Sequence, residues 1–302
     1  MIRVLKPGLL TTVQDLGRRG STHLGVSPGG AADQVSFRIA NALVGNQQSA
    51  PALEVTLIGP TIEFDVATTI AICGGVTASI PMDEAFEVPA GTCVALGPLS
   101  AGARAYLAVR GGLAISPVMG SCSTFLPAKF GGLAGRALST GDTLTIGKQT
   151  DRSPRKLSPN FVEKFKTHER VLRATASLQS DWFDHEDIER FYKQPFIVTD
   201  QSNRSGLRLN SEPILTRQHR ELLTEGIALG AVQVPPDGQP IILFIDQQTT
   251  GGYPKIANVI AADLPRVGQL RPRDQIKFQP VSIPQAIELL RSQERELLEA
   301  FS

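Results

Sequence analysis

Cysteine and net charge are both scarce in this 302-residue chain. The three cysteines, Cys73, Cys93 and Cys122, are an odd number without Cys-x-x-Cys spacing, so neither a disulfide framework nor a zinc site is indicated, and we expect free thiols. Lys and Arg number 30 against 29 Asp and Glu, which gives a net charge of +1. Because nucleic-acid-binding proteins carry a basic excess, this balance argues against that class.

Long apolar runs are also missing. No stretch approaches the ~20 residues that a helix needs to span a bilayer, and the first residues lack the apolar core of a signal peptide. We therefore expect a cytoplasmic protein with no membrane segment.

The common motifs of nucleotide, metal and acyl chemistry are absent. The chain has no GxxxxGK[ST], since Gly141 to Lys148 has the wrong spacing, and no GxGxxG, HExxH or GxSxG. Four histidines show no ligand spacing, which predicts that no metal is held. Ser121 and Cys122 are interpreted as part of a turn, the alternative being a nucleophile whose base is not recognisable. Any ATP site of the phosphate-loop kind is therefore elsewhere.

Short apolar or alternating segments separated by Gly, Pro, Asn and Asp make up most of the sequence and predict a mainly β (α+β) fold. The chain holds 28 Gly and 21 Pro, so turns are frequent. The clearest strand candidates are residues 2–6, 53–58, 69–73, 104–109, 232–234 and 241–246.

Three helices are predicted among the strands, over residues 33–44, 184–193 and from 282 to the end. The last begins with Ser282 and Gln285, the spacing of a capping box. An apolar stripe follows on this helix, formed by Ile283, Ile287, Leu290, Leu297 and Phe301.

The length favours two domains, and a charged, strand-poor stretch between Lys148 and Arg170 indicates where they join. We place an N-terminal β-barrel-like domain at residues 1–150 and a C-terminal barrel domain with the terminal helix at 151–302. Basic and acidic residues alternate in the connector, which favours a solvated linker over a phosphate-binding patch.

The first of three polar, glycine-rich clusters covers residues 12–20 and 25–33. Its glycines allow the backbone N–H groups to come close to a ligand or to another loop, while Asp15, Arg18 and Asp33 are available for polar contacts. The structural alternative is that Asp15 anchors a turn and Asp33 caps a helix.

The second cluster, residues 200–209, contains Ser202, Asn203 and Arg204 before a short strand. A guanidinium can grip a substrate carboxylate bidentately, and this is the role we favour for Arg204. The alternative is an ion pair with an internal acid such as Glu221.

The third cluster surrounds the apolar strand at 241–246. A buried strand with polar groups before it and after it can build a pocket on a rigid support. The expected catalytic residues are Asp246, Thr250 and Tyr253, and the expected substrate-binding residues are Ser202, Asn203, Arg204, Gln233, Gly251 and Gly252.

Nine strings occur in order along the chain: TTVQDLGRRG, GVSPGGAAD, APALEVT, RGG, PVMGSCST, GGLAGR, SNRSGLRL, QVPPDGQPI and DQQTTGGYP. Together they resemble the family formed by the C subunits of bacterial ATP-dependent 5-oxoprolinases and the carboxyltransferase domains of urea amidolyases. Members are also described as the second subunit of allophanate hydrolase or as biotin-dependent carboxyltransferases.

The resemblance implies cyclophilin-like β-barrels and a heteromeric hydrolase in which this chain acts with a B subunit and an A subunit. That complex opens 5-oxoproline to glutamate, with ATP bound through the B subunit. One alternative is a carboxyltransferase that acts on urea or another small amide. It would need a separate biotin carrier, because Met occurs only at positions 1, 82 and 119 and no AMKM-like segment is present. Another alternative is a regulatory antagonist of a kinase-inhibitor partner.

Overall fold

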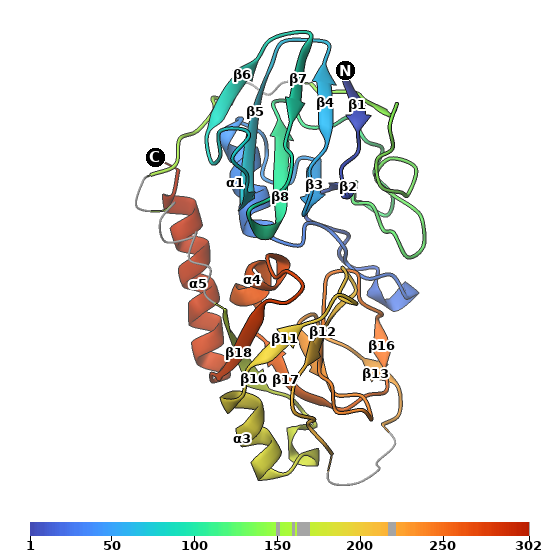
Figure 1. Ribbon diagram of the computed structural model, residues 1–302, viewed down its shortest axis with the longest axis vertical. Helices are drawn as coiled ribbons and strands as arrows, with labels where there is room; N and C mark the ends of the chain where they lie inside the picture. The colour runs from blue at the N-terminus through green and yellow to red at the C-terminus, as the bar shows by residue number, and fades with distance from the viewer. Residues whose placement is uncertain (149–151, 159–160, 162–169, 217–221, 302) are drawn as a thin grey trace. The chain divides into compact units, whose positions relative to one another are not determined.

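The computed structural model describes residues 1–148, 152–158, 161, 170–216 and 222–301, and it is built mainly of β-strands (Figure 1). The chain divides into two compact units. The N-terminal unit comprises residues 1–19, 29–167 and 296–302, and the barrel unit comprises 20–28 and 168–295. Within the described residues, no helix is long and apolar enough to cross a membrane.

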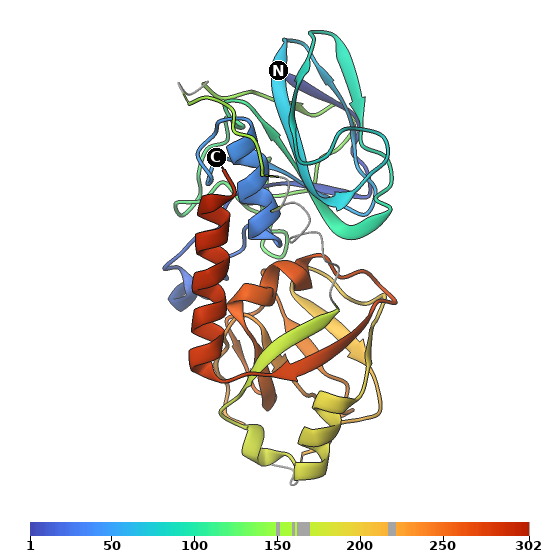
Figure 2. The ribbon, with the colours of Figure 1, turned by 90° about the vertical axis from the view of Figure 1, so that its left-hand side faces the viewer.

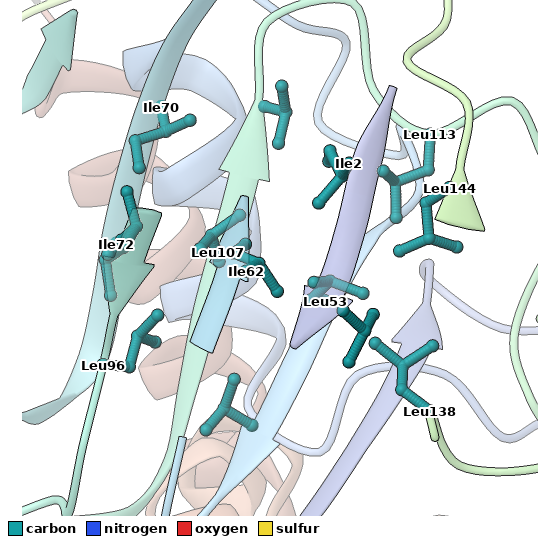
Figure 3. Packing of buried hydrophobic residues seen from close by; sticks show 14 of the residues in the cluster. Ile2, Leu53, Ile62, Ile70, Ile72, Leu96, Leu107, Leu113, Leu138 and Leu144 are labelled. Atoms are coloured by element: carbon teal, nitrogen blue, oxygen red, sulfur yellow. The ribbon is translucent and has the colours of Figure 1, made fainter. Parts of the chain in front are cut away.

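The N-terminal unit contains two antiparallel sheets with a shared core. In strand order, the first sheet is β7 (Thr92–Ala95), β4 (Thr61–Phe64), β1 (Ile2–Lys6) and β9 (Thr143–Leu144). The second is β2 (Leu10–Gln14), β3 (Ala52–Thr56), β8 (Ala101–Val109), β5 (Thr68–Val76) and β6 (Ala85–Val88). Ile2 and Ile62 from the first sheet pack with Leu53, Ile72 and Leu107 from the second (Figure 3).

A second core lies on the opposite face of the five-stranded sheet. Successive residues of a strand point to opposite faces, so Leu107 joins the first core while Tyr106 and Ala108 join the second. Helix α1 (Gln34–Leu43) covers this face with Phe37 and Leu43 (Figure 2).

The C-terminal end of the chain completes this second core. Helix α5 (Ile283–Glu299) runs from the barrel unit into the N-terminal unit, where Leu297 and Ala300 are buried in the same cluster as Phe37. The core of the N-terminal unit therefore contains residues from both ends of the chain.

The barrel unit is a closed seven-stranded barrel. Its order is β10 (Val171–Ala176), β17 (Lys255–Val259), β14 (Ala231–Gln233), β15 (Ile241–Leu243), β12 (Gly206–Asn210), β11 (Phe196–Val198) and β18 (Gln275–Pro280). β18 returns to pair in parallel with β10, and the other pairs are antiparallel (Figures 1 and 2). Closure leaves no unpaired sheet edge in the barrel.

Short elements surround the barrel. They are η1 (Thr22–Leu24), η2 (Ser180–Trp182), α3 (His185–Lys193), η3 (Ala261–Asp263) and α4 (Leu264–Gly268). A separate two-stranded sheet pairs β13 (Glu225–Gly226) with β16 (Thr250–Gly251), and this sheet carries part of the candidate site.

The mainly β class and the C-terminal barrel are confirmed. In the N-terminal unit the strands form two facing sheets where we expected a barrel-like arrangement. The expected boundary at 150/151 falls on residues 149–151, outside the described residues. The units themselves divide before His168, and residues 20–28 and 296–302 each belong to the unit opposite to the one expected.

Candidate functional site

Arg204 and Asp246 form a buried, two-pronged ion pair on the loops that follow β11 and β15. Arg204 Nε lies 2.8 Å from Asp246 Oδ2, and Arg204 Nη2 lies 3.1 Å from Oδ1. The two side chains are 5% and 1% exposed. The backbone repeats the contact, since the Asp246 N–H donates to the Arg204 carbonyl at 3.0 Å. The guanidinium therefore contacts an internal acid, although that acid is Asp246; Glu221 lies outside the described residues.

Ser202 and Asn203 stabilise the turn that carries Arg204. The Ser202 hydroxyl accepts the Arg208 N–H at 3.0 Å, and Asn203 Oδ1 accepts the N–H groups of Ser205 and Gly206 at 2.8 and 3.3 Å. Asn203 thus forms a side-chain turn of the kind that Asn favours. Both expected substrate-binding side chains are used in local structure, and this structure positions Arg204.

Gln233, Gly251 and Tyr253 lie together at the other end of β15. Gln233 is 1% exposed and pairs with Ile241, the first residue of that strand, and its Nε2 donates weakly to the Tyr253 carbonyl at 3.4 Å. A Cβ on Gly251 would lie 2.9 Å from Gln233 Nε2 and 2.4 Å from Ile227 Cδ1. Glycine at 251 therefore leaves room for the buried amide.

The remaining residues of the third cluster are more accessible. Thr250 is exposed in β16, and Tyr253 is 45% exposed. Gly252 lies close to the backbone of the segment that precedes β13, with Leu222 O 3.2 Å from its hypothetical Cβ. The Arg204–Asp246 pair thus follows the last residue of β15, and Gln233, which pairs with the first residue of that strand, lies with Gly251 and Tyr253.

Sequence reasoning missed a third polar group, which adjoins Gln233. Lys255, the first residue of β17, pairs with Gln233 at a bulge in the ladder, and its ammonium donates to Glu225 Oε1 from β13. Gln179 Nε2 donates to the same carboxylate oxygen at 2.9 Å. The Lys255 hydrogen bond lowers the pKa of Glu225 below its ordinary value of 4.5. The sequence feature that could have indicated this group is a lysine directly after the GGYP string, at the start of an apolar strand.

Two buried glutamine carbonyl groups near this region lack donors. Gln179 Oε1 and Gln247 Oε1 accept no hydrogen bond from the part of the chain that the structure describes. Gln247 Nε2 donates to the Ile227 carbonyl at 3.0 Å, which ties the turn after β15 to the segment after β13. Buried acceptors without partners are costly, so a ligand N–H or a water is a natural partner for each.

The first cluster is in the N-terminal unit and is held by internal contacts. Asp15 accepts the hydroxyl groups of Ser121 and Ser123 at 2.7 and 2.5 Å and the Cys122 N–H at 2.6 Å. Burial, followed by the charge of Asp15, raises the pKa of the Cys122 thiol. A thiol with a raised pKa is a poor nucleophile, which favours the turn interpretation of residues 120–123.

Arg18 and Asp33 complete that cluster. The Arg18 guanidinium donates to the Ser123 carbonyl at 2.5 Å and lies 4.8 Å from the Phe130 ring centroid, a cation–π contact. Asp33 is the N-cap of α1, where its side chain accepts the Ser36 N–H at 3.0 Å. These are the structural roles named as alternatives for Asp15 and Asp33.

The described residues contain no group of three or more His, Cys, Asp or Glu side chains that could hold a metal ion. Around β15 and β17 they offer buried amide groups, the buried Lys255 ammonium and the buried Arg204–Asp246 pair. These groups could recognise a small polar molecule through hydrogen bonds.

Comparison with known proteins places the whole chain among relatives of similar sequence. The chain is 40% identical to the C subunit of the Escherichia coli 5-oxoprolinase, covering 98% of this chain and 96% of that protein. It is 35% identical to the urea amidolyase of Saccharomyces cerevisiae, covering 97% of this chain and 17% of that protein. The crystal structure of the Kluyveromyces lactis urea amidolyase superposes with a TM-score of 0.92 and 34% identity, covering 98% of this chain and 20% of that one.

A family model described as "Carboxyltransferase domain, subdomain A and B" matches residues 24–280. The matched region contains the closed barrel and all three polar groups that surround β15 and β17. The chain belongs to this carboxyltransferase-domain family.

Proposed function

We propose that this chain is the C-type subunit of an ATP-dependent 5-oxoprolinase, in which it acts with a B subunit and an A subunit to open 5-oxoproline to glutamate. One observation carries the proposal: the chain and its E. coli relative are alike over nearly their full lengths, at 98% and 96% coverage. The urea amidolyase relatives are far longer, and the chain spans about a sixth of their length.

The chemistry required is the activation of an unreactive amide. A five-membered lactam is stabilised by resonance, so its hydrolysis is slow and coupling to ATP provides the driving force. In this proposal the Gln233 amide hydrogen-bonds to the lactam, with Thr250 and Tyr253 at the accessible side of the site. The Arg204–Asp246 pair acts as a positioning pair that fixes the loop after β15.

The residues described do not fit ATP itself. The chain has no phosphate loop, and the N-terminus of α1, which follows Gly29 and Gly30, is capped by the Asp33 carboxylate. A carboxylate at that position occupies the place where a phosphate would bind and repels it. The proposal therefore assigns nucleotide binding to a partner protein, and this chain's residues act on the amide.

The test is to reconstitute the chain with B-type and A-type partners and to measure ATP hydrolysis and glutamate release with 5-oxoproline, urea and 2-pyrrolidinone. The proposal expects ATP hydrolysis and glutamate release that depend on 5-oxoproline and on all three proteins. Stimulation by urea and none by 5-oxoproline would overturn it. ATP hydrolysis that is never stimulated by substrate would point to a regulatory role.

A biotin-dependent carboxyltransferase is the second candidate, favoured by the TM-score of 0.92 with the K. lactis urea amidolyase. It predicts transfer of carboxylate from a biotinylated carrier to urea or a related amide. Carboxylation assays with and without such a carrier separate the two candidates, because lactam opening needs no carrier.

A further inference from the structure

Lys255 is buried in an unusual way. Its side chain is 7% exposed, whereas the side chain of its partner Glu225 is 39% exposed. Lysine is almost never buried to this extent without a partner, since removing an ammonium from water is costly. The acid is the more exposed member of this pair, and the ammonium lies against its carboxylate.

The ammonium has hydrogen-bonding capacity that the protein does not use. A lysine offers three N–H donors. Among the described residues, Lys255 makes one hydrogen bond, to Glu225 Oε1. Gln179 adds a second donor to that oxygen, so Glu225 is held in place by two side chains. Two donors on a buried cation remain for an acceptor that is not part of the described chain.

Gln233 is the strand partner of Lys255. The two residues are paired on β14 and β17 at a bulge, where the register shifts between Val232 and Gln233, and paired residues on neighbouring strands lie side by side. Gly251 packs directly against the Gln233 amide, since a Cβ there would lie 2.9 Å from Gln233 Nε2. A cation and an amide are thus adjacent, with the buried, partnerless Gln179 Oε1 close to Glu225.

This pairing matches the chemistry of a small lactam that carries a carboxylate. In 5-oxoproline the carboxylate is attached to the carbon that is bonded to the lactam nitrogen, so charge and amide are separated by only a few ångströms. A carboxylate accepts charge-assisted hydrogen bonds from an ammonium, and an amide exchanges hydrogen bonds with a glutamine.

We propose that Lys255 is the residue that binds the substrate carboxylate, while Gln233 binds the adjacent amide. The proposal rests on the 5-oxoprolinase function, because it names the recognised group of that substrate. Lys255 takes the role expected of Arg204, whose guanidinium is engaged by Asp246. A substrate without a carboxylate, such as urea, gains nothing from this ammonium.

The experiment uses the reconstituted complex and three variants of this chain. For each, the KM for 5-oxoproline is measured by glutamate release, and 2-pyrrolidinone, the same lactam without a carboxylate, is measured as a competitive inhibitor. Lys255→Met is expected to raise the KM for 5-oxoproline roughly 10- to 100-fold, the range expected for loss of a hydrogen bond to a charged group. The inhibition constant of 2-pyrrolidinone should not change.

Glu225→Gln is the informative partner variant. It removes the acidic partner of the same ion pair and keeps the Lys255 ammonium. Because the Glu225 carboxylate no longer competes with the substrate carboxylate, the KM for 5-oxoproline should stay the same or fall. A purely structural ion pair predicts that both variants impair the enzyme alike. Lys193→Met removes an exposed lysine of the same unit and controls for the change in net charge.

The outcomes separate the two proposals. If the wild-type complex never acts on 5-oxoproline, the proposed function fails and this inference fails with it. If the wild type is active but Lys255→Met keeps its KM, or if both variants raise the KM equally, only the inference is overturned. Should Lys255→Met fail to fold, Glu225→Gln still decides, because a raised KM in that variant contradicts the assigned role.

Discussion

Removing one member of the Arg204–Asp246 pair should destabilise the barrel unit more than removing both. Arg204→Met leaves the Asp246 carboxylate without its guanidinium at a position that is 1% exposed, and Asp246→Leu removes the carboxylate that two nitrogen atoms of Arg204 contact. Such a loss costs about 3–5 kcal/mol of unfolding free energy. The double variant leaves apolar side chains of similar size, so it should recover most of that loss.

Urea unfolding followed by tryptophan fluorescence provides the measurement. Trp182 is the only tryptophan in the chain and lies in η2, within the barrel unit, so its signal reports on this unit. With a slope of about 2 kcal/mol per M urea, the single variants should shift the midpoint down by about 1.5–2.5 M. Glu189→Gln, which removes the partner of exposed Lys193, should leave the midpoint unchanged.

The reasoning would be refuted by single variants that cost less than about 1 kcal/mol, the value typical of exposed ion pairs. It would be refuted equally by a double variant that loses the sum of the two single losses, because a coupled pair cannot be additive. Either result would mean that the pair is hydrated and does not fix the loop after β15.

Three other contacts have measurable consequences. The pKa of Glu225 is lowered in the folded state, so this residue stabilises the fold above its ordinary pKa of 4.5, and the stabilisation is lost as the pH falls below that value. Glu225→Gln should therefore make the free energy of unfolding less dependent on pH in this range. Gly251→Ala should reduce the rate of lactam opening, because its Cβ would crowd the Gln233 amide. Gly226→Ala should leave this rate unchanged, because a Cβ at 226 would have no atom within 4 Å, and steady-state kinetics measures both variants. Tyr106→Phe removes the hydroxyl that donates to Glu54 at 2.9 Å, and thermal unfolding should show a loss of about 1–3 kcal/mol.

Local features were predictable from sequence where neighbouring residues decide them. The capping box at Ser282 forms as predicted, with Gln285 Oε1 accepting the Ser282 N–H at 2.8 Å, and α5 starts at the next residue. The predicted helix at 33–44 is α1, with Asp33 as its cap. Strand β1 has the predicted bounds of 2–6.

Contacts between distant segments were not predictable in this way. The predicted strand at 241–246 ends at Leu243, because the following residues turn back and Gln247 N–H donates to Phe244. The partner of Arg204 is 42 residues away in sequence, and that of Lys255 is 30 away. Local pattern carries no information on which acid a buried cation meets, since strand pairing and barrel closure decide it.

The apolar stripe of the terminal helix shows the same limit. Ile283 and Ile287 are 65% and 46% exposed, and Leu297 is the buried residue of α5. Periodicity identified the helix and its apolar face, but it could not indicate which part of that face is covered.

Burial of Leu297 and Ala300 with Phe37 has a consequence for synthesis. A protein emerges from the ribosome N-terminus first, and its domains usually fold in that order. Here the N-terminal segment must wait for a segment about 260 residues later, because the second core of the N-terminal unit is incomplete until Leu297 and Ala300 have been made. The barrel, whose strands all lie between Val171 and Pro280, can close earlier. A released chain truncated after Arg295 should therefore contain a protease-resistant barrel and an N-terminal portion that is still cleaved.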